Sequence, residues 1–165
     1  MIFKIKKGHH YSDGFLYKIF NFFHKSDRIR KIVNFNENSK YIDETLDKFD
    51  VNKLFGFSNG YHHKNSYRFG WNCLDGKIHI YAYSYINSIR QIDEICSINT
   101  NQEYKFIIKV NKNKVIFSVI NDKFILTQIV QTMEKLPKNN IIKYTLWPYF
   151  GGNKIAPKNI LIELI

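Results

Sequence analysis

The dipeptide Asp75-Gly76 constrains the fold of this chain more than any other feature. It stands between two segments in which apolar and polar side chains alternate, residues 66–74 and 77–86. Asp-Gly is among the strongest short signals for a two-residue hairpin turn, because both residues tolerate the positive φ angles that such turns need. Successive side chains of a strand point to opposite faces. The sequence therefore predicts a β-hairpin with two chemically different faces.

Pairing across this turn assigns each side chain to a face. One face is expected to pack on a hydrophobic core, with Tyr67, Phe69, Trp71, Ile78, Ile80, Ala82 and Ser84. A one-residue slip would turn every side chain of one strand over, and the matching of apolar residues argues against it. The other face is predicted to be exposed, and it bears Ser66, Arg68, Gly70, His79, Tyr81, Tyr83 and Tyr85.

The second face has the chemistry of a recognition surface. Tyrosine rings stack on flat ligands, and the planar fork of an arginine binds phosphate or carboxylate. We therefore predict a site for an anionic ligand that contains a ring. The alternative is a tyrosine-rich face that covers another sheet or a subunit interface, since tyrosine is common on strands for packing reasons alone.

The rest of the chain predicts an all-β fold. Strand-like segments separated by turn residues recur at 1–7, 28–35, 53–60, 88–95, 103–111, 114–120, 123–132, 141–147 and 159–165. Residues 15–23 are predicted to form a hairpin with 28–35, a helix being the alternative. A short helical turn is predicted at 43–46. Roughly ten short strands at regular spacing are typical of an antiparallel β-sandwich or jelly roll, here one domain over 1–165 with at most two short helical turns.

Two further segments join the predicted site. Residues 62–65 precede the hairpin and would lie at its rim. Gly151-Gly152 would let the backbone and Lys154 approach an anion, unless the pair only forms a tight corner between strands. The predicted ligand-binding residues are His62, His63, Lys64, Asn65, Ser66, Arg68, His79, Tyr81, Tyr83, Tyr85, Trp147, Tyr149, Gly151, Gly152, Asn153 and Lys154.

The charge and the cysteines indicate partners and compartment. Lysine and arginine number 25 against 14 acidic residues, a net charge of +11 that predicts attraction to phosphate, carboxylate or sulfate groups. An AT-rich genome would give a similar excess of lysine. Cys73, placed in the hairpin turn, and Cys96 are expected to be free thiols. Without a signal-peptide pattern or a long apolar segment, we expect a cytoplasmic protein with no membrane partner.

Catalytic and metal motifs do not stand out. Adjacent histidines on a strand point to opposite faces, so the pair His62-His63 predicts no metal site, and no cofactor is expected. The sequence contains no P-loop or GxGxxG motif, so no catalytic residue is assigned and a binding protein is favoured over an enzyme. The strongest catalytic alternative is proton abstraction beside a carboxylate, with Tyr83 as acid, His79 as base and Arg68 as neutraliser.

Two segments resemble a known signature. HHKNSYRFGW (62–71) and LWPYFGGNKIAP (146–157) are similar to the HHxNSxRFGW and PYFGGNxxAP patterns of a family of small bacterial and phage proteins. The resemblance implies a jelly-roll-like sandwich. It also implies a shared site that includes His62, His63, Asn65, Ser66, Arg68, Gly151, Gly152 and Asn153. Lys158-Asn159 departs from the acidic or histidine-bearing continuation of the family.

Several functions fit these features. The leading hypothesis is a non-enzymatic binder that sequesters a small phosphate-bearing ligand such as a nucleotide signal, as a phage anti-defence sponge in the host cytoplasm would. Arg68, Lys64 and Lys154 would meet the phosphates, and Tyr81, Tyr83 and Trp147 would stack. The alternatives are a jelly-roll carbohydrate-binding protein or polysaccharide lyase acting on an acidic glycan, a single-stranded nucleic-acid binder, and a homo-oligomer with the tyrosines at its interface.

Overall fold

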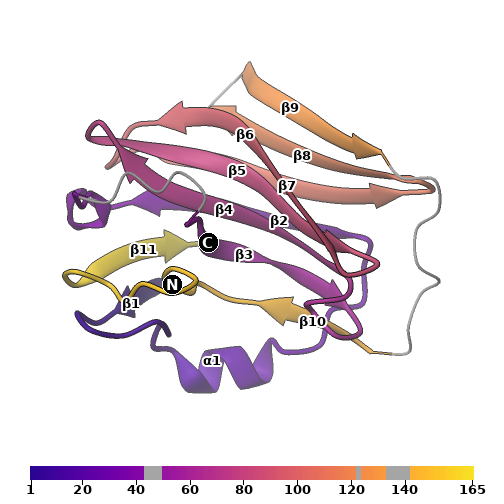
Figure 1. Cartoon of the computed structure of the whole chain (residues 1–165), viewed down its shortest axis with the longest axis horizontal. Coiled ribbons are helices and arrows are strands. Elements are labelled where there is room, and N and C mark those ends of the chain that lie inside the picture. Colours follow the sequence, from indigo (N-terminus) through magenta and orange to yellow (C-terminus); the bar gives the residue numbers. More distant parts are fainter. Residues whose placement is uncertain (43–49, 122–123, 133–141) are drawn as a thin grey trace.

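Two antiparallel sheets pack face to face in the computed structural model, which describes residues 1–42, 50–121, 124–132 and 142–165 (Figure 1). The six-stranded sheet has the order β1-β11-β2-β7-β8-β9, and the five-stranded sheet the order β10-β3-β4-β5-β6. This arrangement confirms the predicted jelly-roll β-sandwich. The strands are β1 Ile2–Ile5, β2 Arg28–Phe35, β3 Asn52–Asn59, β4 Ser66–Leu74, β5 Lys77–Ile86, β6 Ile89–Ile98, β7 Glu103–Asn111, β8 Lys114–Asn121, β9 Phe124–Thr132, β10 Lys143–Leu146 and β11 Ile160–Leu164.

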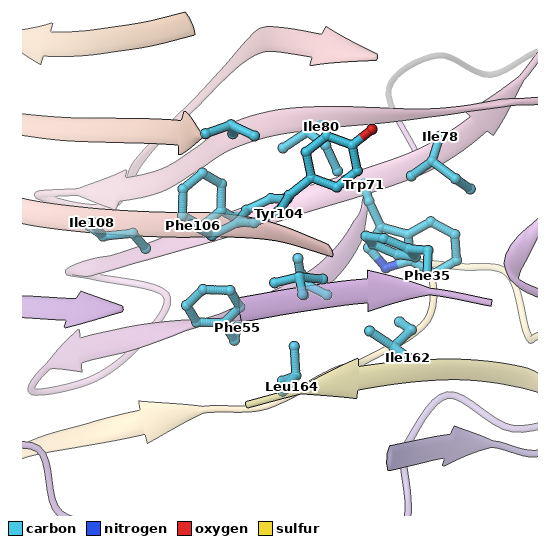
Figure 2. Packing of buried hydrophobic residues seen from close by; sticks show 14 of the residues in the cluster. Phe35, Phe55, Trp71, Ile78, Ile80, Tyr104, Phe106, Ile108, Ile162 and Leu164 are labelled. Carbon is cyan, nitrogen blue, oxygen red and sulfur yellow. The ribbon is translucent and has the colours of Figure 1, made fainter. Parts of the chain in front are cut away.

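One hydrophobic core lies between the two sheets. Figure 2 shows side chains of both sheets in this cluster, among them Trp71 beside Phe35. The ring centroids of these two residues lie 5.1 Å apart, and those of Phe69 and Phe106 lie 4.8 Å apart. Burying one such side chain contributes roughly 1.5–3 kcal/mol. The predicted core face of the hairpin is confirmed, since all of its members are buried.

The hairpin of β4 and β5 has the predicted register. Arg68 lies opposite Tyr83, and Asn72 lies opposite His79. The turn contains only Asp75 and Gly76, whose φ angles are 50° and 71°. Cys73 was predicted in this turn but lies inside β4, where it is buried, because two residues suffice to reverse the chain. Cys73 and Cys96 are both free thiols, as predicted.

The hairpin predicted for residues 15–35 is wrong in its first half. Helix α1, Phe15–Phe20, replaces the expected strand. Tyr17 anchors the helix by edge-to-face packing on Trp147, with ring centroids 5.4 Å apart. The residues after α1 bond to β10 and not to β2: the Thr145 N–H donates to the Phe22 carbonyl at 2.7 Å. Alternating apolar residues alone could not reveal this different partner.

A short helical turn follows β2. This 3₁₀ turn, η1 Glu37–Ser39, is capped by the Asn36 side chain, which accepts from the Asn38 N–H at 3.0 Å. The helical turn predicted at 43–46 and the turn at Asp122 lie outside the described residues. Among the described helices, neither has the length or the apolar character to cross a membrane.

Candidate ligand-binding groove

A groove of about 800 Å³ lies on the face of the five-stranded sheet that points away from the core. Side chains of β3 to β6 and β10 form its floor, α1 and the residues after it form one wall, and residues 147–152 form another. No aspartate or glutamate occurs among its described lining residues. The cationic and aromatic lining side chains of the floor and rim are Lys53, His62, His63, Arg68, Tyr83, Tyr85, Arg90 and Tyr144.

Arg68 is the central cation of this groove. It is only 8% exposed, and its guanidinium carbon lies 5.5 Å from the centre of the Tyr83 ring. Its Nε is buried without a hydrogen-bond partner, and no carboxylate of the described chain forms an ion pair with it. Burial lowers the pKa of the Arg68 guanidinium, although neighbouring tyrosines oppose the shift. A buried cation without a counter-ion destabilises the fold, so an anionic ligand would relieve a cost that the free protein bears.

Lys53 brings a second cation to the same tyrosine. Its Nζ lies 5.2 Å from the centre of the Tyr83 ring and donates a hydrogen bond to the Gly151 carbonyl at 3.0 Å. Burial, and then the charge of Arg68, lower the pKa of Lys53 to about 8. Two cations therefore share one aromatic ring. The two charges repel each other, and the Asp50 carboxylate offsets this repulsion only in part at Lys53, so a negative charge placed between the two cations would be stabilised.

The depressed pKa of Lys53 has a measurable consequence. Between pH 8 and 10.5, the unfolded chain binds more protons at Lys53 than the folded chain does, so the free energy of unfolding should rise with pH in this window. The gain is at most about 3.5 kcal/mol, because each pKa unit corresponds to about 1.4 kcal/mol. Urea unfolding of the ligand-free protein from pH 7.5 to 9.5 would show the rise. Lys53→Met should lack that component, and equal slopes in both proteins would contradict the assignment.

His62 and Tyr144 form a hydrogen-bonded pair at the groove wall. The His62 Nδ1 and the Tyr144 hydroxyl oxygen are 2.9 Å apart. Burial, followed by the charges of Arg68 and His63, lowers the pKa of His62, which keeps the imidazole neutral at neutral pH. With the ring proton on Nε2, Nδ1 accepts from the tyrosine hydroxyl. The pair can therefore hold or relay a proton near Arg68.

The geometry expected for the histidine pair is wrong. Residues 61–64 form a turn and not a strand, so the rings of His62 and His63 lie together, with centroids 4.3 Å apart. His63 also packs edge-on against Tyr85 at 5.4 Å. Among the described residues, no group of three histidine, cysteine or acidic side chains is placed to hold a metal ion.

The Gly151-Gly152 loop reaches the groove, but its backbone is already bonded. The Gly151 N–H donates to the Asn52 side-chain oxygen at 2.5 Å, and the Gly152 N–H donates to an Asp50 carboxylate oxygen at 2.7 Å. The loop also pairs with β3, because Tyr149 and Lys53 exchange backbone hydrogen bonds of 2.9 and 2.8 Å. These two N–H groups are therefore not available to an anionic ligand, contrary to the prediction, and the loop acts as a wall.

The predicted aromatic face is also more buried than expected. Arg68, Tyr81 and Tyr83 are buried, although the prediction placed them on an exposed face. Val51 packs against both tyrosines on this face. A Cβ at Gly70 would lie 2.4 Å from a Val51 methyl carbon, so the glycine provides the room for this contact. The bare sequence gave no sign that Val51 would cover the face.

Nine of the sixteen predicted site residues line the groove. They are His62, His63, Arg68, Tyr83, Tyr85, Trp147, Tyr149, Gly151 and Gly152. Trp147 contributes mainly to packing, since its ring stacks on Phe3 with centroids 5.6 Å apart. Segments 62–85 and 147–152, more than 60 residues apart in sequence, thus meet in one groove.

The other seven predicted residues do not line it. Asn65 and Ser66 are buried, and they shape the turn through bonds with the Asn87 N–H (3.0 Å) and the His62 carbonyl (2.7 Å). His79 lies beside Glu94, 2.7 Å from its carboxylate, and Tyr81 donates to Asn72 at 3.1 Å. Lys154 lines a separate smaller pocket. Lys64 and Asn153 belong to neither lining.

Several groove residues were missed by sequence reasoning. Lys53 follows Asn52 and precedes the apolar residues Leu54 and Phe55, so its position in the sequence does not mark it as a site residue. The sequence does not mark Arg90 and Tyr144 either, because only strand pairing brings β6 and β10 into the same sheet as Arg68. The wall made by Phe15, Ile19 and the residues that follow α1 was hidden by the mistaken hairpin.

Two solved structures of other proteins are similar to this chain in fold. No protein-family model matches the chain, and no curated protein matches its sequence. The alginate lyase of Klebsiella pneumoniae is similar in structure, with a TM-score of 0.60, 10% identity, and coverage of 84% of this chain and 58% of the lyase. The CBM2 module of the Lactobacillus casei BL23 phage J-1 evolved Dit gives a TM-score of 0.50 at 12% identity, covering 83% of this chain and 61% of the module. The chain therefore spans about three-fifths of either structure, and at such low identity the likeness shows the jelly-roll fold alone.

Proposed function

We propose that the groove binds an acidic carbohydrate, with the carboxylate or sulfate of one sugar between Arg68 and Lys53. The observation that carries this proposal is the buried Arg68, whose Nε has no partner and whose groove has no acidic side chain in its described lining. Charge-assisted hydrogen bonds from an arginine fork to a carboxylate are the strong kind, and a buried site strengthens them.

The tyrosines of the groove floor favour a sugar as the group that carries the acid. Tyr83 and Tyr85 pack edge to face, with ring centroids 5.8 Å apart, and both line the groove. Tyrosine combines a flat apolar surface with a hydroxyl group, which suits a ring that also carries hydroxyl groups. Two structures of the same fold, an alginate lyase and a carbohydrate-binding module, point in the same direction.

Calorimetric titration with an alginate trisaccharide tests the proposal. We expect saturable binding that weakens with added salt, because the contact is between charges. Cellotriose, a neutral trisaccharide, should show no binding. ATP and a cyclic dinucleotide form a further arm: binding of either one without the trisaccharide would overturn the proposal in favour of sequestration of a phosphate-bearing ligand. Uniform binding of unrelated single-stranded DNAs alone would instead indicate a nucleic-acid binder.

Cleavage of the same ligand is a second candidate function, favoured by the His62–Tyr144 pair beside Arg68. Arg68 would stabilise the carboxylate while the tyrosine, having passed its proton to His62, takes the proton from the adjacent carbon. The glycosidic C–O bond then breaks, a C=C bond forms, and the leaving oxygen takes the proton that the tyrosine has gained. His62 then returns the original proton to the tyrosine. Ultraviolet absorbance of an unsaturated uronate during the same titration would identify a lyase. Recovery of intact trisaccharide would identify a binding protein.

A further inference from the structure

Helix α1 is unusual because none of its residues is buried although most of them are apolar. Phe15 is 73% exposed and Phe20 is 84% exposed, and the outward side chains continue through Phe23. Contiguous exposed apolar surface is uncommon on folded proteins and marks a place where something binds. The helix itself is held by Tyr17 and Lys18, so the exposed side chains are not needed to attach it.

Only one side of this helix belongs to the groove. Phe15 and Ile19, one turn apart, line it, and Phe22 and Phe23 continue the same wall. The Phe22 ring stacks on Tyr144 with a centroid distance of 5.1 Å and an angle of 6° between the planes. Leu16 and Phe20, also one turn apart, lie outside the lining. The helix thus presents one apolar pair to the groove and a second exposed apolar pair elsewhere.

The groove changes in chemistry across the strands. The wall of α1 stands beyond the β10 edge of the five-stranded sheet, as Figure 1 shows and the Phe22–Thr145 hydrogen bond confirms. The cations Lys53, Arg68 and Arg90 lie on β3, β4 and β6. With strands spaced about 4.8 Å apart, the backbones of β4, which bears Arg68, and of the edge strand β10 are separated by roughly 10 Å.

A sugar ring is a poor match for the apolar wall. Phe15, Ile19 and Phe23 offer no hydrogen bond, so hydroxyl groups placed there would lose water without replacement. Lys18 of the same helix also lines the groove, but its Nζ already donates to the Ser12 carbonyl at 2.5 Å. An alkyl or acyl group has no polar atoms to desolvate, and it gains by leaving water.

We infer that the ligand is amphiphilic: an acidic sugar that carries an apolar chain, with the acid at Arg68 and Lys53 and the chain along Phe15 and Ile19. This inference rests on the proposed function and adds the substrate class to it. One part of the groove is cationic and the adjoining part is apolar. A single molecule that has both an acidic group and an apolar chain would match both parts.

Three ligands test the cationic and the apolar part of the groove separately: glucuronate carries only the acid, octyl glucoside only the chain, and octyl glucuronide both. The two octyl compounds are used below their critical micelle concentrations. Octyl glucuronide is expected to bind at least tenfold more tightly than glucuronate, since burying about two methylenes contributes that factor. It should also bind at least tenfold more tightly than octyl glucoside, which lacks the carboxylate for Arg68 and Lys53. The double variant Phe15→Ser/Ile19→Ser should lose the gain of the chain and keep the affinity for glucuronate. Leu16→Ser/Phe20→Ser, with the same spacing on the same helix, should behave as the unaltered protein.

The outcomes are distinguishable. If the alginate trisaccharide and glucuronate bind but the octyl chain adds nothing, the inference is wrong and the proposed function stands. If no acidic ligand binds, both fail. A third outcome is that the protein sediments with phosphatidylcholine vesicles, or self-associates, and that both double variants abolish this behaviour. The apolar surface of α1 would then contact a membrane or a second copy, and the inference would be overturned.

Discussion

Replacement of Arg68 by methionine should weaken binding of an acidic sugar by 100-fold or more while making the ligand-free protein more stable. The loss corresponds to about 3 kcal/mol, typical of removing one partner of a buried charge contact. Methionine fills similar space without a charge, so the buried and unpaired Nε disappears together with its desolvation cost. We expect a stability gain of about 1 kcal/mol. Calorimetry of ligand binding and urea unfolding measure the two effects.

Arg30 supplies the matched control for this experiment. It is an exposed arginine of β2 in the other sheet, so Arg30→Met removes the same charge far from the groove. That variant should keep its affinity and its stability within about 0.5 kcal/mol. Equal weakening by both variants would mean that net charge, and not the groove, attracts the ligand. Loss of stability in Arg68→Met would mean that Arg68 is a structural residue.

Replacement of Gly151 by alanine should destabilise the fold by about 3 kcal/mol and weaken ligand binding as well. The residue has a φ angle of 66°, and a Cβ there would lie 2.2 Å from the Lys154 carbonyl oxygen. The loop must move to relieve this clash, which breaks the bond from the Gly151 N–H to Asn52 and the one that Lys53 makes to the Gly151 carbonyl. The groove would therefore lose one wall and the support of a cation.

The Gly8→Ala variant is the control for Gly151→Ala, because it introduces backbone strain without a steric clash. Gly8 has a φ angle of 79°, but nothing lies within 4 Å of a Cβ built there. Alanine should therefore cost only about 1 kcal/mol, the penalty for a left-handed conformation. Thermal unfolding of both variants measures the difference. Equal destabilisation would show that the close contact at Lys154 is relieved without cost.

The fold could be predicted from the sequence where the alternation of apolar residues and the pairing of neighbouring strands indicated the same structure. Asp75-Gly76 and the alternation on both sides determined the turn, the register and the core face together, because a slip of one residue would bury Arg68 in the core and expose Phe69. The segment 15–23 failed for the opposite reason. Its apolar residues fit a strand and a helix equally well, and a contact with Trp147, distant in sequence, decided between them.

The candidate site was only partly accessible to sequence reasoning. Arg68 and the tyrosines of β5 were identified because alternate residues of paired strands point to the same face of a sheet. Whether a backbone N–H is free to bind an anion cannot be read from glycines, and those of Gly151 and Gly152 are taken by Asn52 and Asp50. His79 shares this face with Arg68 but lies near the other end of the hairpin, so a shared face did not mean a shared site.

The Nε–H resonance of Arg68 offers the most direct test of the account. In ¹H–¹⁵N spectra, it can be assigned as the arginine signal that disappears in Arg68→Met. Because this Nε is buried without an acceptor, we expect its resonance to show the largest shift among the arginine side chains when alginate trisaccharide is added. An unmoved Arg68 signal, with shifts confined to exposed arginines such as Arg28 and Arg30, would contradict the account.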